Sequence, residues 1–107
     1  MVKLISEDRA HLEYVEPNYW INYNPLMYKG NGSVELEVQV ESANVRIKPG
    51  CMSCTTASIL ESKDNIHRIR ITYDTKIVGT FTKTVTFFYL ENGQEKPIYF
   101  KIKGTVK

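Results

Sequence analysis

Two cysteines, Cys51 and Cys54, are the residues of this sequence best suited to chemistry. Thiolates at a C-x-x-C spacing can supply half of a zinc site, or hold a soft ion such as Cu(I) with Met52 as a thioether ligand. A closed zinc site needs four ligands, and the histidines at positions 11 and 67 form no second close pair. Cys51 and Cys54 are therefore the candidate metal ligands, but the sequence does not complete a site around them.

A redox role for the same pair needs a helix that the neighbouring residues do not favour. Redox C-x-x-C pairs usually begin a helix, whose dipole lowers the pKa of the thiol. Here Pro49-Gly50 precedes the pair and the β-branched Thr55 and Thr56 follow it, which favours a turn between two strands. We expect Cys51 and Cys54 to pack as small side chains at one end of the fold, and we expect no cofactor.

The sequence contains no motif for catalysis. His67 falls in register with Ile69 and Ile71, which predicts an inward-facing strand residue, and His11 has no acid or nucleophile at a telling spacing. No nucleophile elbow, phosphate-binding glycine loop or acidic metal cluster occurs. We therefore expect a protein without enzymatic activity.

Length and composition indicate one soluble domain. The 107 residues are 42% hydrophobic and 24% charged, and 14 Lys and Arg against 12 Asp and Glu leave a net charge of +2, too balanced for a nucleic-acid partner. The first fifteen residues hold no apolar signal segment, and the longest apolar stretch, 85–90, is far shorter than the roughly 20 residues of a membrane helix. We expect cytoplasmic synthesis without a signal peptide, and neither nucleic acid nor membrane as partner.

Alternation of apolar and polar residues predicts strands along most of the chain. The pattern is clear over 34–41, 68–73, 81–90 and 98–106, and weaker over 12–16, 19–23, 44–48 and 56–60. Asn92-Gly93 predicts a tight hairpin turn between the last two strands. Pro97 and the lysines of the last strand are typical of a sheet edge.

Charges on two of these strands predict which strands are neighbours. Glu35 and Glu37 lie on the polar side of one, and Arg68 and Arg70 on the polar side of another. Opposite charges that face each other across a strand pair select a register. We expect these two strands to pair.

These patterns predict an all-β fold, an immunoglobulin-like antiparallel β-sandwich of about seven strands, with a small barrel as the alternative. No segment has a sustained helical period and no repeat occurs. We expect a single domain over 1–107, in which 1–32 forms a less regular, aromatic-rich N-terminal arm. Asn31-Gly32 is expected in a turn.

The segment 18–28 is the candidate partner-binding region, because it is dense in aromatic residues and also holds a methionine. Tyr, Trp and Met are the side chains that supply interface hot spots. The alternative is that the rings cap the core of a small sandwich. The candidate residues are Tyr19, Trp20, Tyr23, Met27 and Tyr28.

The C-terminal two-thirds of the chain, about 33–107, resembles a known family. Cys54-Thr55 and the stretches 69–75, 79–85 and 100–106 follow one another as in a bacterial immunoglobulin-like family of unknown function marked by an S-C-G-C-T motif. That family is similar to the major-sperm-protein and ASH sandwiches. It has one residue between its cysteines, whereas two occur here, so only Cys54 carries over and a shared thiol or metal role stays open. Its members usually bear a secretion or lipoprotein signal, which this chain does not show.

A lone module of this kind without catalytic residues fits a building block of a larger assembly. Immunoglobulin-like domains resemble the small decoration or auxiliary proteins on capsids of tailed phages, so we expect a structural, non-enzymatic virion protein that binds a protein partner. One alternative is a thiol or metal module, for copper or zinc, of a bacterial envelope protein. Another is an intracellular adaptor with a single partner.

Overall fold

The computed structural model describes residues 2–5, 10–23, 31–50, 55–74 and 77–106. Within these ranges every regular element is a strand, and no helix is long and apolar enough to cross a membrane. The strands are β1 (Val2–Leu4), β2 (Ala10–Val15), β3 (Asn18–Tyr23), β4 (Asn31–Gln39), β5 (Val45–Pro49), β6 (Thr55–Lys63), β7 (Ile66–Asp74), β8 (Gly79–Glu91) and β9 (Gln94–Val106).

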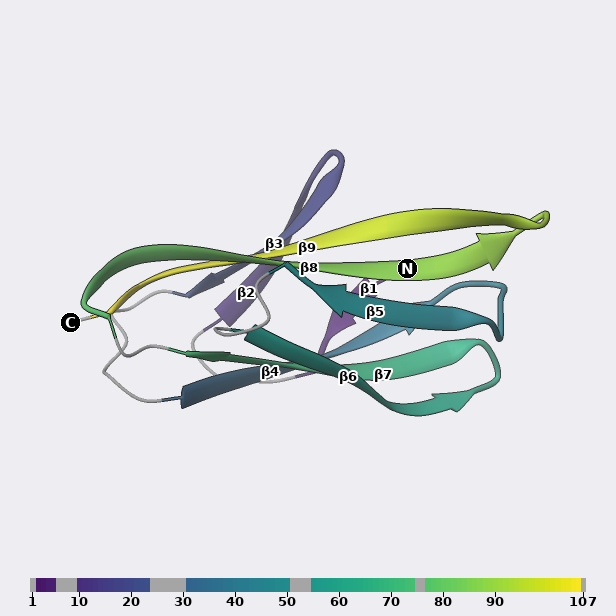
Figure 1. The fold of residues 1–107 in the computed structure, drawn as a ribbon, viewed down its shortest axis with the longest axis horizontal. Coiled ribbons are helices and arrows are strands. Elements are labelled where there is room, and N and C mark those ends of the chain that lie inside the picture. Colours follow the sequence, from purple (N-terminus) through teal and green to yellow (C-terminus); the bar gives the residue numbers. More distant parts are fainter. Residues whose placement is uncertain (1, 6–9, 24–30, 51–54, 75–76, 107) are drawn as a thin grey trace.

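The strands form two sheets that face each other as a sandwich (Figure 1). One sheet has the order β1-β4-β7-β6, and the other has the order β2-β3-β9-β8-β5. The four-stranded sheet has the strand order of one sheet of a constant-type immunoglobulin domain. In the five-stranded sheet, β9, β8 and β5 have the order of the other. The predicted immunoglobulin-like sandwich is therefore confirmed. The described residues contain nine strands where about seven were expected. All eight patterned segments form strands, the weaker ones included, and β1 is too short to show an alternating pattern.

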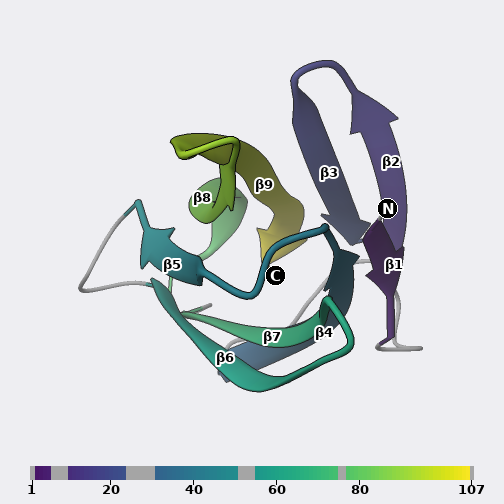
Figure 2. The same cartoon turned by 90° about the vertical axis from the view of Figure 1, so that its right-hand side faces the viewer.

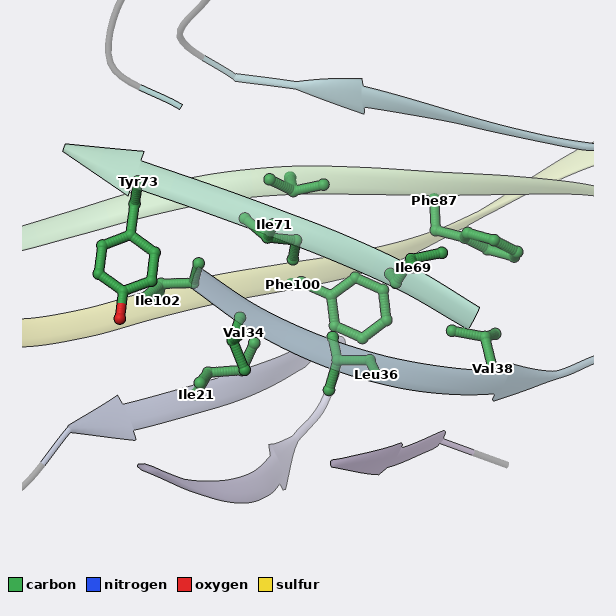
Figure 3. Packing of buried hydrophobic residues seen from close by; sticks show 11 residues of the cluster. Ile21, Val34, Leu36, Val38, Ile69, Ile71, Tyr73, Phe87, Phe100 and Ile102 are labelled. Atoms are coloured by element: carbon green, nitrogen blue, oxygen red, sulfur yellow. The ribbon is translucent and has the colours of Figure 1, made fainter. Parts of the chain in front are cut away.

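The core lies between the sheets and consists of the residues that alternation turns inward (Figure 3). Each fully buried side chain of this size contributes about 1.5 to 3 kcal/mol relative to an exposed one. The buried cluster contains Ile21, Val34, Leu36, Val38, Ile69, Ile71, Tyr73, Val85, Phe87, Phe100 and Ile102. All four strongly patterned segments supply members of this cluster, so their predicted inner faces are confirmed.

The predicted pairing of the acidic and basic strands is also confirmed. β4 pairs with β7 in an antiparallel register that sets Glu35 opposite Arg70 and Glu37 opposite Arg68. A carboxylate oxygen of Glu35 lies 3.9 Å from a guanidinium nitrogen of Arg70. Both side chains are partly exposed, so the pair selects the register more than it stabilises the fold.

Two hairpins close through turns with positive φ angles. Asn92 and Gly93 have φ of 53° and 77°, and Asp64 and Asn65 have φ of 54° and 64°. Positive φ at both central residues is the geometry of the tight turn that suits twisted antiparallel strands. The Asn-Gly turn between the last two strands is therefore confirmed.

The last strand lies inside its sheet, so the prediction of an edge was wrong. β9 pairs antiparallel with β8 on one side, and its residues 99–103 pair in parallel with residues 18–22 of β3 on the other. Pro97 lies outside that parallel segment, where its missing N–H removes no bond to β3. A parallel pairing between strands so far apart in the sequence produces no local pattern, so the sequence does not indicate that β9 has a second neighbour.

Asn31-Gly32 belongs to β4, so the expected turn at this place was wrong as well. Gly32 pairs with Tyr73 of β7. A Cβ atom at position 32 would lie 2.5 Å from ring atoms of Tyr73, so only glycine leaves room for this ring. The glycine is required by close packing within a strand rather than by a turn.

The N-terminal residues 2–5 and 10–23 supply strands to both sheets. β1 pairs with β4 in the four-stranded sheet, whereas β2 and β3 form a hairpin that extends the five-stranded sheet. Ile21 is completely buried, and Leu4 and Leu12 pack against the same core. The described part of this segment therefore belongs to the sandwich (Figure 2).

We predict that Arg70→Glu lowers the free energy of unfolding by about 1 kcal/mol, because it replaces an attraction to Glu35 with a repulsion. The double variant Glu35→Arg, Arg70→Glu restores the attraction and is expected to recover most of the loss. Urea denaturation of the three proteins measures both changes. Equal stability of Arg70→Glu and the wild type would show that the facing charges do not interact.

Candidate functional site

Two of the predicted contact residues, Tyr19 and Trp20, lie on opposite sides of the sheet because they are neighbours in β3. The Tyr19 ring points inward, with its centroid 5.7 Å from that of Phe100 and 4.7 Å from that of Tyr14. Burial raises the pKa of Tyr19, and Tyr14 adds to the shift. Trp20 faces outward, and the Nζ atom of Lys101 lies 5.8 Å from the centre of its ring.

The other predicted site residues cannot be placed beside these two. Tyr23 ends β3 opposite Ala10, but its side chain lies outside the described part of the structure. Met27 and Tyr28 lie outside the described residues, as do Cys51 and Cys54. Among the residues that the structure describes, no group of three or more His, Cys, Asp and Glu is arranged to hold a metal ion.

The outer face of the five-stranded sheet gathers aromatic, basic and threonine side chains around Trp20. Its residues alternate with the buried ones, and the strand registers place them in rows across the sheet. Two neighbouring rows cross the sheet. One crosses four strands and contains Glu13, Trp20, Lys101 and Thr84, and the other crosses all five and contains Val15, Asn18, Tyr99, Thr86 and Lys48. We call this surface, together with Phe88 and Lys103 beside these rows, the aromatic-lysine face.

Arg46 covers a third ring of this face, Phe88. Its guanidinium carbon lies 4.0 Å from the ring centre, and two of its nitrogens donate hydrogen bonds of 2.7 Å to the two carboxylate oxygens of Glu95. These bonds lower the pKa of the Glu95 carboxyl and raise the pKa of Arg46. A planar guanidinium suits both contacts, because it stacks on a ring and binds a carboxylate with two nitrogens. The charge of Arg46 is therefore already matched within the protein.

The lysines of the aromatic-lysine face have no such match. No ion pair joins Lys48, Lys101 or Lys103 to any acidic residue in the described ranges. Glu13, in the same row as Lys101, accepts a 3.4 Å hydrogen bond from the side-chain amide of Asn22 instead. This face therefore offers uncompensated positive charge beside half-buried aromatic rings.

The outer face of the four-stranded sheet differs because its charges alternate from strand to strand. One row runs Lys3, Glu37, Arg68 and Glu61 across β1, β4, β7 and β6. A surface hollow on this sheet likewise brings acidic and basic side chains together, since Glu37, Glu61, Asp64, Lys63 and Arg68 line it with Ile66. Opposite charges at this spacing offset each other, which leaves little net charge for a partner.

His67 is a core residue, as the strand register predicted. Its side chain is 1% exposed, and its ring centroid lies 5.9 Å from that of Phe87. Nε2 is 2.8 Å from the backbone carbonyl oxygen of Ser42, and Nδ1 is 2.8 Å from the hydroxyl oxygen of Ser62. A carbonyl only accepts, so Nε2 donates to Ser42, and in the neutral ring Nδ1 then accepts from the hydroxyl of Ser62. Both ring nitrogens of His67 thus form hydrogen bonds within the fold.

Sequence reasoning missed most of the aromatic-lysine face. Tyr99, Lys101 and Lys103 alternate with core residues of β9, so their outward direction can be predicted, but outward lysines are typical of a sheet edge as well as of a binding face. The neighbouring position of Trp20 depends on the parallel pairing of β3 with β9. Without that pairing, nothing in the sequence connects Trp20 with these lysines.

Comparison of this chain with known family models, curated proteins and solved structures finds no match. The resemblance of residues 33–107 to the family with the S-C-G-C-T motif therefore stays a prediction. The surface is interpreted from its own residues and geometry.

We predict that Ile21→Ala lowers the free energy of unfolding by about 3 kcal/mol, because it leaves a cavity in the core. Trp20→Ala, at the next position, is expected to cost no more than about 1 kcal/mol, because it removes contacts on one outer face only. Chemical denaturation followed by circular dichroism compares the two variants. A Trp20→Ala protein as unstable as Ile21→Ala would place the indole in the core.

His67→Leu is expected to destabilise the protein by about 2 kcal/mol, because it leaves the partly buried carbonyl of Ser42 without the imidazole donor. Ser62→Ala removes only the bond to Nδ1 and is the milder matched change. Thermal and urea unfolding measure both variants. A His67→Leu protein as stable as the wild type would show that these two hydrogen bonds contribute nothing net.

Proposed function

We propose that this protein is a non-enzymatic binding module that attaches to an acidic protein surface in a larger assembly through the aromatic-lysine face. The observation that carries the proposal is the difference between the two outer faces. Lys48, Lys101 and Lys103 have no acidic partner among the described residues, whereas the charges of the other sheet lie opposite one another. An acidic partner would supply the missing counter-charges.

The side chains of this face suit a protein partner. Trp20 and Tyr99 offer large rigid surfaces, and lysines at their edges attract an acidic partner over distance. The strands that carry them are held by the core, so little conformational entropy is lost on binding. A broad sheet face also matches a protein surface better than a small molecule, which is usually bound in a concave pocket.

The assembly that we propose first is a virion, in which the protein decorates the capsid of a tailed phage. An immunoglobulin-like sandwich with a binding face suits that role, and the warrant is an analogy of fold. The same face would serve an intracellular adaptor equally well. The two roles differ in the partner, which is a symmetric array of identical subunits in the first and a single protein in the second.

We predict that Lys101→Glu, Lys103→Glu weakens binding to the native assembly at least about tenfold, because it reverses two charges at the face. Lys3→Glu, Lys63→Glu makes the same change in net charge on the four-stranded sheet and is the matched control. Size-exclusion chromatography with lysate of the native source, followed by detection of the tagged protein, measures co-elution with a multimer. Co-elution that both double variants retain equally would contradict this use of the face.

A defined acidic polypeptide gives a second test. Poly-glutamate is expected to change the fluorescence of Trp20, the one tryptophan of the chain, in a manner that salt suppresses. The Lys101→Glu, Lys103→Glu protein should lose this response and the control pair should keep it. Tighter binding to single-stranded RNA than to poly-glutamate would replace the proposed protein partner with a nucleic acid.

A further inference from the structure

Each sheet of the sandwich ends in two edge strands, and three of these four strands carry features that oppose pairing with another chain. Edges are commonly blocked by short length, by lysine and proline, or by bulges. β1 has three residues, β5 ends in Lys48 and Pro49, and β6 has a register shift between Ile59 and Glu61.

β2 is the edge without these features. All six of its residues, Ala10–Val15, pair with β3 in an unbroken register, and the strand contains neither lysine nor proline. Tyr14 and Val15 are 56% and 52% exposed, which is high for residues of this size in a strand. In both views the turn of the β2–β3 hairpin stands clear of the two layers (Figure 1, Figure 2).

We propose that β2 pairs antiparallel with β2 of a second copy of this chain, around a two-fold axis perpendicular to the sheet. The two five-stranded sheets would then form one continuous sheet. No strand in the described ranges pairs with the outer side of β2, so its backbone groups there can supply the hydrogen bonds, and its side chains determine the register.

The residues of β2 favour one register, in which the axis passes through Leu12. Residues on the same face of the sheet must meet, so Leu12 lies opposite Leu12 of the second copy and His11 lies opposite its Glu13. The same register sets the small Ala10 opposite the large Tyr14. An axis through Glu13 would instead bring two carboxylates together, which is destabilising. The strand is therefore complementary to itself in size, and a ring N–H of His11 can donate a hydrogen bond to the Glu13 carboxylate of the second copy.

The proposed dimer has a consequence for the proposed function but does not depend on it. The two-fold axis keeps both aromatic-lysine faces on the same side of the joined sheet. Two linked faces bind a repetitive acidic surface with higher avidity than one face does. Loss of dimerisation would therefore leave each single face intact, and loss of face binding would leave the dimer intact.

The test is sedimentation equilibrium of the purified protein over a range of concentrations. We expect a reversible monomer–dimer equilibrium. His11→Glu is expected to weaken it about tenfold, because it replaces two symmetry-related His–Glu hydrogen bonds with two pairs of like charges. The double variant His11→Glu, Glu13→Lys places opposite charges across the interface in this register alone and should recover the dimer. Thr56→Glu adds a negative charge at an edge of the other sheet, on β6, and should change nothing.

His11 and Glu13 are exposed, so these variants are expected to fold, and circular dichroism checks that they do. A second variant, Val15→Lys, places a lysine on the edge and should also favour the monomer. A protein that stays monomeric up to about millimolar concentration would overturn the proposal, because a dimer with a weaker dissociation constant would not be specific. A dimer that His11→Glu leaves unchanged, or that the double variant fails to restore, would overturn the proposed register and with it the β2 interface.

Discussion

The parallel pairing of β3 with β9 is the contact on which the rest of the structure depends. It joins residues 18–22 to residues 99–103, a sequence separation of about three quarters of the 107-residue chain. Through it Ile21 enters the core, Trp20 reaches Lys101, and β9 becomes an interior strand. It also makes β2 the edge of the five-stranded sheet. A contact at this sequence separation carries a high entropic cost of loop closure, which the buried surface of Ile21 and Tyr19 helps to offset.

Alternation along each strand then divides the side chains between a shared interior and two unlike exteriors. The interior is apolar apart from groups such as His67, whose two nitrogens are both hydrogen-bonded. On the four-stranded sheet, acidic and basic strands lie side by side and their charges offset each other. On the five-stranded sheet, lysines stand between aromatic rings with their charge unmatched among the described residues. Both faces are built from extended strands, so the difference in charge between them comes from their side chains.

The fold could be predicted from the sequence wherever the signal is local. The unbroken alternation around Leu36 and Ile69, the Asn92-Gly93 turn and the facing charges of β4 and β7 each depend on residues near one another in sequence or on simple complementarity. The pairing of β3 with β9 has no such signal, and neither has the space above Gly32 that Tyr73 fills. The candidate site was predicted only in part, since strand alternation separates Tyr19 from Trp20 and brings Trp20 to lysines far along the chain.

Proton NMR of the folded protein tests the β3–β9 pairing most directly. The ring of Trp20 should shift the side-chain methylene resonances of Lys101 to higher field, and nuclear Overhauser contacts should join the backbones of residues 18–22 and 99–103 in a parallel pattern. Contacts of this kind would establish both the interior position of β9 and the aromatic-lysine face. A spectrum in which Trp20 shows no contact with Lys101, while the β8–β9 contacts are intact, would contradict the pairing.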